Sequence, residues 1–489
     1  MRPFVLLLQP GVGDMDDFRD RPTPPVSLLA AATLVARDCE VQIVDQRLLP
    51  DWRERIRDAL SRQPVVVGVT TLPGPMIRNA LEMVAEVRAH SRTPVVWGGT
   101  HVSLIPEQAI RSPAVDYVVV GEGEVAFASL VDHLSRGRQP RDVPGVWGKD
   151  PDGSVYQGPP SPVLAFDRLP LPPYHLVPME DYLYSHRGTR RLDYLSSRGC
   201  PHTCSYCYNN VFYRNAWTPR PAHQVLEEIA RLRERYAFDT VYFLDDNFFV
   251  DVARGWRIGL GLRDMGIGYE TQGVDIQTVA AMSDRDLDRL EASGLGKLTI
   301  GVESACDRTR RLIRKWGDRR AVLATLRRLA GRSFLVLTSF IIGFPFETWE
   351  EIQETIDFAL ELQSLGRNFR FPQLYNYIPL PGTPLARALE QAGFHFPESL
   401  EAWAEIDWDR SALFRENPQK LDRLASIAFL SKFVDRKFED YGARPGVAAL
   451  YRLYRPVACA RLRHGWTDWV PERRAYAVVK RLAARRRGR

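Results

Sequence analysis

The chain has 489 residues, of which 45% are hydrophobic and 26% are charged, and its net charge is +6. These values are typical of a water-soluble globular protein with about three domains. No run of about 18 apolar residues occurs, so no membrane-spanning helix is expected. The N-terminal run MRPFVLLLQPG lacks the longer apolar region and cleavage site of a signal peptide, so none is expected.

Residues 1–140 alternate apolar runs typical of strands with amphipathic runs typical of helices. The strand candidates are FVLLLQ, VQIVDQ, VVVGVT, PVVWGG and VDYVVVGEG. Continuous apolar strands separated by helices predict an α/β fold, with a doubly wound parallel sheet between two layers of helices. Ligands bind such sheets at the carboxyl ends of the strands. The candidate residues at these ends are Thr70, Thr71, Gly98, Gly99, His101, Gly121 and Glu122.

The region 141–190 is rich in Pro, Gly and Asp, and its weak periodicity predicts a linker. Residues 191–395 return to alternating strand and helix patterns. Six strands with intervening helices predict a partial (β/α)6 barrel, with strands near 193–198, 240–245, 268–273, 297–303, 336–343 and 372–378. Residues 396–489 lack strand patterns and predict a C-terminal helical cap.

Positive charge is concentrated at the C-terminal end, RRAYAVVKRLAARRRGR. A basic tail can contact nucleic acid or an anionic membrane. A solvated, partly frayed terminal helix accounts for the same composition, and we favour it. We therefore expect no membrane partner, and little in the sequence supports a nucleic-acid partner.

Three of the six cysteines lie close together, at Cys200, Cys204 and Cys207 in the run SRGCPHTCSYCYN. The other three are scattered and show no disulfide framework, which is typical of a reducing cytoplasm. The C-x3-C-x2-C spacing supplies three thiolates for one 4Fe-4S cluster and leaves one iron open. A structural zinc site would need four ligands and a second C-x2-C pair, which is missing. We expect His202, inside this loop, to be exposed rather than a fourth ligand.

The cysteine loop resembles that of the radical S-adenosylmethionine (radical-SAM) superfamily. In that superfamily SAM chelates the open iron, and an aromatic residue stands where this chain has Tyr206. The resemblance covers about 200 residues and implies a 4Fe-4S cluster, SAM and an external electron donor of flavodoxin or ferredoxin type. The protein then positions and tunes these groups, while the chemistry is that of the cofactors.

Motifs at four later strand ends extend the resemblance. The run VYFLDDNFF resembles the acidic motif that holds the SAM amino group, although the common family form is glycine-glycine-glutamate. A strand-end turn is the alternative interpretation of that run. The runs LTIGVESACD, SFIIGFPFET and YNYIPLPGTPL resemble the segments beside the ribose and the adenine. The residues implied as SAM contacts are Asp245, Asp246, Asn247, Glu303, Ser304, Gly343, Tyr377 and Ile378.

The N-terminal part resembles the cobalamin-binding domain that precedes many radical-SAM domains, in the phrases PVVWGGTHVSLIPE and VDYVVVGEGEVAF. This implies that the strand-end residues named above border the corrin or its tail. His101 could equally be a residue that only begins the next helix. Many cobalamin proteins carry a D-x-H-x-x-G loop whose histidine ligates cobalt, but the loop PGVGDMDDFRDRPTPP has no histidine. Cobalamin binding therefore stays open alongside a scaffold without the cofactor.

The resemblance implies an enzyme that abstracts hydrogen from a small-molecule substrate of natural-product type. Cobalamin-dependent C-methylation is the leading outcome. Radical dehydration or rearrangement of a sugar-like substrate is the alternative. A cobalamin or redox sensor would leave the barrel motifs without purpose, and an RNA-modifying enzyme would favour an added RNA-binding domain and further cluster cysteines. The sequence names neither the substrate nor the catalytic residues nor the oligomeric state.

Overall fold

The structure is a computed structural model that describes residues 2–13, 21–186, 189–370, 374–406, 411–414, 417–434 and 445–476. Its contacts divide the chain into two compact units. The first unit comprises Met1–Gly268 and Leu380–Asp407, and the second comprises Tyr269–Pro379 and Trp408–Arg489. The last residues of the basic tail, 477–489, lie outside the described ranges, as do residues 14–20 of the loop after the first strand.

The first unit begins with a seven-stranded sheet in the order β2-β1-β3-β4-β5-β6-β7. Its parallel strands are β1 (Phe4–Gln9), β2 (Glu40–Asp45), β3 (Val66–Thr70), β4 (Val95–Gly98) and β5 (Tyr117–Val119). All six residues of β1 are buried, as expected for a central strand covered on both faces. The five predicted strands and their parallel pairing are confirmed.

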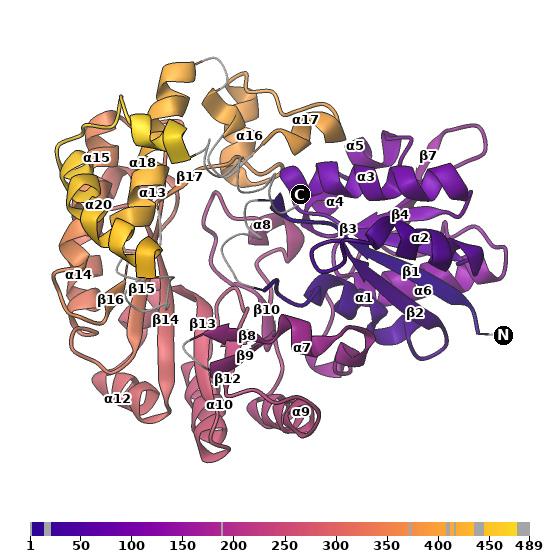
Figure 1. The fold of residues 1–489 in the computed structure, drawn as a ribbon, viewed down its shortest axis with the longest axis horizontal. Helices are drawn as coiled ribbons and strands as arrows, with labels where there is room; N and C mark the ends of the chain where they lie inside the picture. The colour runs from indigo at the N-terminus through magenta and orange to yellow at the C-terminus, as the bar shows by residue number, and fades with distance from the viewer. Residues whose placement is uncertain are drawn as a thin grey trace. The chain divides into compact units, whose positions relative to one another are not determined.

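Helices cover both faces of this sheet (Figure 1). They are α1 (Val26–Val35), α2 (Trp52–Ser61), α3 (Pro75–His90), α4 (Thr100–Leu104), α5 (Pro106–Arg111) and α6 (Gly123–Ser135). Helices α1 and α6 pack together on one face, where Leu28 and Ala32 share a buried cluster with Phe127 and Leu130. Helix α3 packs against α2 and β1 on the other face.

The region predicted as a linker contributes two strands to the same sheet. Strand β6 (Val146–Lys149) pairs antiparallel with β5, and β7 (Val155–Gln157) pairs antiparallel with β6. Val146 and Tyr156 belong to the buried core of the sheet. The strands are three or four residues long and flanked by turn residues, so too few apolar residues recur for a periodic pattern.

The rest of the first unit contains the cysteine loop. Its strands are β8 (Tyr184–His186), β9 (Thr189–Tyr194), β10 (Ser197–Gly199), β11 (Trp217–Pro219) and β12 (Thr240–Phe243). Its α-helices are α7 (Met179–Tyr182), α8 (Asn209–Phe212), α9 (Ala222–Arg235), α10 (Val252–Asp264), α16 (Pro384–Gln391) and α17 (Leu400–Ala404). Strands β9 and β12 are parallel, and β10 pairs antiparallel with β11. Helix α17 packs on α3, so the chain returns to the first unit after leaving it.

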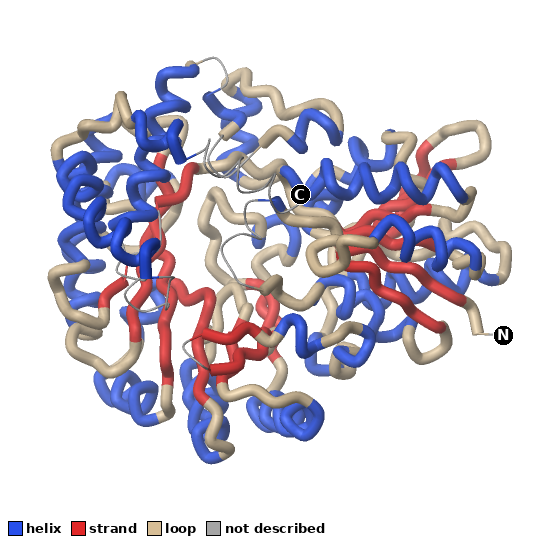
Figure 2. The backbone as a smooth tube through the Cα atoms, in the orientation of Figure 1, coloured by secondary structure: helices blue, strands red, loops and turns tan. Residues whose placement is uncertain are grey.

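The second unit has strands with helices around them (Figure 2), and these strands pair in parallel. Strands β13 (Gly268–Asp275), β14 (Leu295–Glu303), β15 (Leu335–Ile342) and β16 (Phe369–Arg370) pair in this order, and β17 (Leu374–Asn376) pairs with β15. The helices between them are α11 (Ile276–Ala281), α12 (Asp284–Ala292), α13 (Asp307–Leu312), α14 (Arg319–Arg327) and α15 (Trp349–Leu362). The later helices α18 (Pro418–Val434) and α20 (Pro445–Arg463) pack together, as the predicted helical cap requires.

No helix in the described ranges is both long and apolar enough to cross a membrane.

Candidate functional site

The three cysteines lie on the loop between β10 and α8. The backbone N–H of Cys207 donates to the carbonyl oxygen of Cys204 at 3.1 Å. The side-chain amide of Asn210 donates to the carbonyl oxygens of Cys204 and Cys207, at 2.7 and 2.8 Å. These bonds fold the loop into a tight turn and hold two of the cysteines on one short segment. His202 is half-buried, where full exposure was expected.

Side-chain amides and buried surroundings border the sulfurs of this loop. The amide nitrogen of Asn247 is 3.8 Å from the sulfur of Cys200, and that of Asn209 is 3.6 Å from the sulfur of Cys207. Burial raises the pKa of the Cys207 thiol to about 12, so a thiolate there needs a cation beside it. No three His, Cys, Asp or Glu side chains among the described residues are placed to hold a single ion. A cube uses one thiolate per iron, so its ligands need not meet at one point.

The acidic motif after β12 anchors the strand that leads into the cysteine loop. Asp245 accepts hydrogen bonds from the backbone N–H of Ser196 at 3.0 Å, from its hydroxyl at 2.7 Å, and from the hydroxyl of Ser197. Asp246 accepts from the N–H of Gly199 at 3.0 Å and from the Tyr208 hydroxyl at 2.6 Å. Burial raises the pKa of both carboxyls, and these donors oppose the rise.

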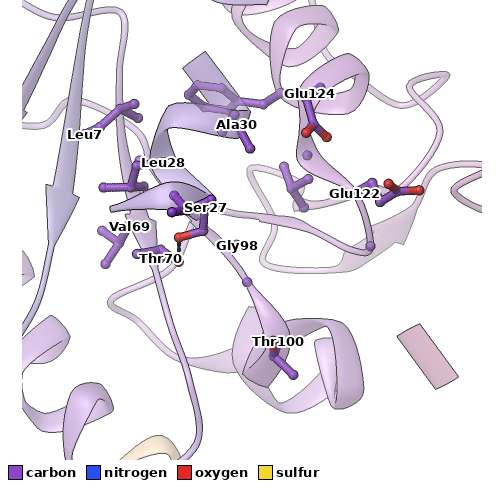
Figure 3. A pocket seen from close by; sticks show the side chains of 18 of the residues that line it. Leu7, Ser27, Leu28, Ala30, Val69, Thr70, Gly98, Thr100, Glu122 and Glu124 are labelled. Carbon is purple, nitrogen blue, oxygen red and sulfur yellow. Dashed lines mark hydrogen bonds between the residues drawn. The ribbon is translucent and has the colours of Figure 1, made fainter. Parts of the chain in front are cut away.

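A cavity of about 260 Å³ opens at the carboxyl ends of the strands in the N-terminal sheet. Figure 3 shows Leu7, Leu28 and Val69 on one side of it and the carboxylates of Glu122 and Glu124 on the other. The hydroxyls of Ser27 and Thr70 bond each other at 2.9 Å at its wall. Ligand pockets are mostly apolar with a few convergent polar groups, and this cavity fits that description.

Two segments of the first unit meet at this cavity. Its lining includes five of the strand-end residues predicted as cobalamin contacts, namely Thr70, Gly98, Gly99, Gly121 and Glu122. It also includes residues on either side of the cysteine loop, namely Leu195, Arg198, Phe212 and Tyr213. The cavity therefore lies between the N-terminal sheet and the segment that carries the three thiols.

His101 and Thr71 do not line the cavity. The His101 ring is buried edge-on against Trp403, with ring centroids 5.3 Å apart. Burial lowers its pKa to about 3, so the ring is neutral. The position of His101 inside α4 matches the helix-entry interpretation of this residue. The Thr71 hydroxyl donates to the carbonyl oxygen of Gly98 at 3.0 Å and ties the two strand ends together.

In the second unit, Glu303 ends β14 in an unusual backbone conformation. Its φ is +69°, and the pairing of β14 with β15 shifts register between Gly301 and Glu303. Lys315 lies between two carboxylates, 2.6 Å from an oxygen of Asp275 and 3.5 Å from one of Glu303. Backbone strain of this kind persists only where surrounding contacts impose it, and it is concentrated at functional sites.

Replacing Glu303 with glutamine tests its predicted role in SAM binding. We expect the affinity for SAM to fall about tenfold or more, because a hydrogen bond to a charged group contributes about 1.5–3 kcal/mol. The cluster should remain intact, and Lys315 keeps Asp275 as a partner. Equilibrium binding of SAM and iron content are the measurements. Glu350→Gln, at an exposed glutamate, is the matched control, and equal affinities would place the ribose contact elsewhere.

The predicted adenine segment is packed tightly. Gly343 has a φ of +77°, and a side chain added there would lie 2.9 Å from Leu424 of α18. Gly343→Val would therefore strain the backbone and the packing as well as any ligand contact. Tyr377 is buried with its ring 4.9 Å from that of Phe344, and Ile378 follows it half-buried. Ser304 is buried and bonds the Thr355 hydroxyl at 3.1 Å.

Glu347 lies in the same SFIIGFPFET run. Its buried carboxyl should make the free energy of unfolding depend on pH. Burial raises the pKa of its carboxyl to about 7, although the N–H of Phe344 donates to it at 2.9 Å. The unfolded chain titrates near 4.5, so the native state holds the extra proton between these values. The stabilisation is complete below about pH 4.5 and is lost as pH rises through about 7, by roughly 3 kcal/mol.

The unfolding temperature of cluster-free protein should therefore decrease as the pH is raised from 5.5 to 8.5. Glu347→Gln keeps an acceptor for the Phe344 N–H but does not titrate, so its midpoint should fall less. Glu350→Gln, at an exposed position in the next turn, should behave as the wild type does. If the unfolding temperatures of wild type and Glu347→Gln change with pH in the same way, a group other than Glu347 causes the pH dependence.

Several site residues were not predicted from the sequence. Arg198 is one of them, and its pairing with Glu124 joins two segments far apart in the chain, which no local motif marks. Lys315, which follows the end of α13 by three residues, contacts Glu303. Asn376 has both side-chain polar atoms buried and without a hydrogen-bond partner in the described part of the chain. Its only sequence signal is a polar residue inside the strand pattern of YNYIPL.

Two family models match the chain. The B12 binding domain model matches residues 20–131, and the radical SAM superfamily model matches residues 194–359. An uncharacterized methyltransferase of Pyrococcus horikoshii, PH0819, is 30% identical over 365 residues, which cover 74% of this chain and 77% of the relative. The cytidylyl-2-hydroxyethylphosphonate methyltransferase of Streptomyces wedmorensis is 25% identical, covering 68% of each chain.

Solved structures share the fold. The cobalamin-dependent SAM radical enzyme OxsB, with aqua-cobalamin and SAM bound, matches 99% of this chain and 75% of its own, with a TM-score of 0.74 and 15% identity. The radical SAM methyltransferase TsrM from Kitasatospora setae, with cobalamin and a [4Fe-4S] cluster, matches 80% of this chain and 75% of its own, with a TM-score of 0.65 and 18% identity. The predicted fold class is confirmed.

The fold and the thiol loop define a radical-SAM enzyme with an N-terminal B12 binding domain. The chain belongs to the cobalamin-associated methyltransferase-like branch of the radical-SAM superfamily. Its cofactors are a 4Fe-4S cluster, SAM and cobalamin, which settles the question that the histidine-free loop had left open. It acts on a small-molecule substrate and needs a reductant.

Proposed function

We propose that the protein adds a methyl group from SAM to a carbon atom of a small molecule, with cobalamin as the methyl carrier. One observation carries this proposal. The cavity at the strand ends of the B12-type sheet is also lined by the segment that holds the three cysteines. A methyl carrier has to lie close to the place where the radical is generated, and this cavity supplies such a place. The methyltransferase names of the two relatives described above support the same reaction.

Residues are proposed for each cofactor. Cys200, Cys204 and Cys207 hold the cluster. The SAM contacts are proposed as Tyr206, Asp245, Asp246, Asn247, Glu303, Ser304, Gly343, Tyr377 and Ile378. The cobalamin contacts are proposed as Thr70, Gly98, Gly99, Gly121 and Glu122, with Thr71 and His101 supporting them from behind the cavity wall. The apolar wall at Leu7, Leu28 and Val69 suits the flat base of the cobalamin tail.

The protein residues orient the groups and exclude water. When bound, the cluster and SAM supply a 5′-deoxyadenosyl radical for hydrogen abstraction, and cobalamin supplies methyl transfer. Asp245 and Asp246 hold the strand before Cys200 through Ser196, Ser197 and Gly199. Buried hydrogen bonds of this kind keep a loop in one geometry, which orients its thiolates.

The setting of the reaction follows from the same chemistry. We propose a natural-product type of substrate, a flavodoxin or ferredoxin as electron donor, and a cytoplasmic location, since a reduced cluster needs a reducing compartment. Residues 191–395 and 396–489 are proposed as the partial barrel and the helical cap. Residues 1–140 are proposed as the cobalamin-binding domain, to which β6 and β7 of the predicted linker 141–190 are added because they pair in its sheet.

The test uses anaerobically reconstituted full-length protein. After incubation with hydroxocobalamin and desalting, about one equivalent of corrin absorption should remain with the protein. Addition of reductant, SAM labelled in its methyl carbon and a fractionated small-molecule extract should then transfer label to a new product. SAM cleavage and product formation without retained corrin would contradict methyl transfer and favour radical dehydration or rearrangement.

A further inference from the structure

Arg198 is a buried arginine held between two buried glutamates. It is 2.8 Å from an oxygen of Glu122 and 2.5 Å from one of Glu124, and all three side chains are at most 7% exposed. Its guanidinium also lies over the Phe166 ring, 4.2 Å from the centroid. Removing one partner from a buried ion pair leaves an uncompensated charge, which is strongly unfavourable. The geometry of this triad is therefore tightly fixed.

The triad belongs to the wall of the cavity. Glu122, Glu124 and Arg198 all line it. Glu122 and Glu124 stand at the N-terminal end of α6, and the second oxygen of Glu122 accepts the backbone N–H of Leu164 at 2.7 Å. A ligand in the cavity would thus lie beside the two glutamates of α6 and the arginine that pairs with them.

The backbone after Arg198 leads directly to the first cluster cysteine. Gly199 pairs with Trp217 across β10 and β11, and its N–H donates to Asp246. Its φ is +74°, and an added side chain would lie 2.1 Å from the carbonyl oxygen of Ala216. The segment between Arg198 and Cys200 is therefore clamped on both sides, so a shift of Arg198 has to move Cys200 or break these contacts.

We infer that Arg198 is a positioning residue that couples corrinoid occupancy of the cavity to the geometry of the cluster loop. The inference rests on the proposed function, since it needs a corrinoid in this cavity. A bound corrinoid fixes Glu122 and Glu124, which hold Arg198 and through it Cys200. Coupling of this kind is reciprocal, so an assembled cluster has to tighten corrinoid binding by the same factor.

The test compares the affinity for hydroxocobalamin of cluster-free and reconstituted full-length protein, followed by corrin absorption. In the wild type the cluster should tighten binding by about fivefold or more. In Arg198→Met the cluster should still assemble, but cluster-free and reconstituted protein should bind hydroxocobalamin with equal affinity. Arg198→Lys, which can reach one carboxylate at a time, should recover part of the difference. Arg214→Met, at an exposed arginine beyond the cysteine loop, is the matched control and should keep the whole difference.

A purely structural role would weaken both affinities of Arg198→Met and leave their ratio as in the wild type, which would overturn the inference. If Arg198→Met does not assemble a cluster, Glu122→Gln replaces it, because glutamine can still accept the Leu164 N–H. A normal ratio in Glu122→Gln would overturn the inference equally. Wild-type protein that binds hydroxocobalamin with the same affinity in both states would overturn the coupling alone. Wild-type protein that binds no hydroxocobalamin in either state would overturn both the coupling and the proposed function.

Discussion

Replacing any one of Cys200, Cys204 and Cys207 with alanine should abolish SAM cleavage. The reconstituted wild type should hold about four irons at this loop, and three of these irons each depend on one of the three thiolates. Loss of one thiolate leaves two protein ligands for four irons, too few to hold a cube. Iron content, the charge-transfer absorption of the cluster and the yield of cleaved SAM are the three measurements, and all three should fall together.

Cys459→Ala is the matched control, because Cys459 lies in α20, outside the cysteine loop. It should keep both iron and activity. A variant of Cys200, Cys204 or Cys207 that retained full SAM cleavage would contradict the assignment of the loop.

Filling the cavity should weaken corrinoid retention while leaving the cluster in place. Ala30 lines the cavity from α1 (Figure 3), and phenylalanine there would occupy space that the corrinoid tail needs. We expect Ala30→Phe to bind the corrinoid roughly 5- to 150-fold more weakly than the wild type, because a steric overlap costs about 1–3 kcal/mol. Corrin absorption after desalting is the measurement.

Ala85→Phe is the control, since Ala85 is exposed on α3 and lies outside the cavity lining. The iron content of both variants should match that of the wild type, which separates a blocked cavity from a misfolded chain. Normal corrin retention by Ala30→Phe would place the cobalamin tail elsewhere. If Ala30→Phe still cleaves SAM but no longer transfers the methyl group, the result would support the proposal that methyl transfer depends on cobalamin and SAM cleavage on the cluster.

The strands were predictable because each is a continuous apolar run between turn residues. FVLLLQ is buried along its whole length, and so is VVGVT of the predicted run VVVGVT, as the pattern indicated. The two short strands in the expected linker were not predictable, since β7 exposes two of its three residues. A pattern of period two needs four or more residues to be recognised.

The candidate site was predictable where one short motif carries it and not where distant segments meet. The cysteine loop could be read from eight residues. The pairing of Arg198 with Glu122 and Glu124 depends on contacts across more than 70 positions, which no local pattern encodes. The environment of His101 likewise depends on Trp403, about 300 positions away in the chain, and no local pattern indicates that contact.

The packing of α17 on α3 has a consequence for synthesis of the chain. Trp403 emerges about 300 residues after His101, and at roughly 5–20 residues per second the ribosome needs about 15–60 s to make that stretch. During this interval the N-terminal sheet is already outside the ribosome, but the surface that α17 covers is still bare. Newly made protein should therefore depend on chaperones most strongly before residue 407 appears, and shorter N-terminal fragments should aggregate.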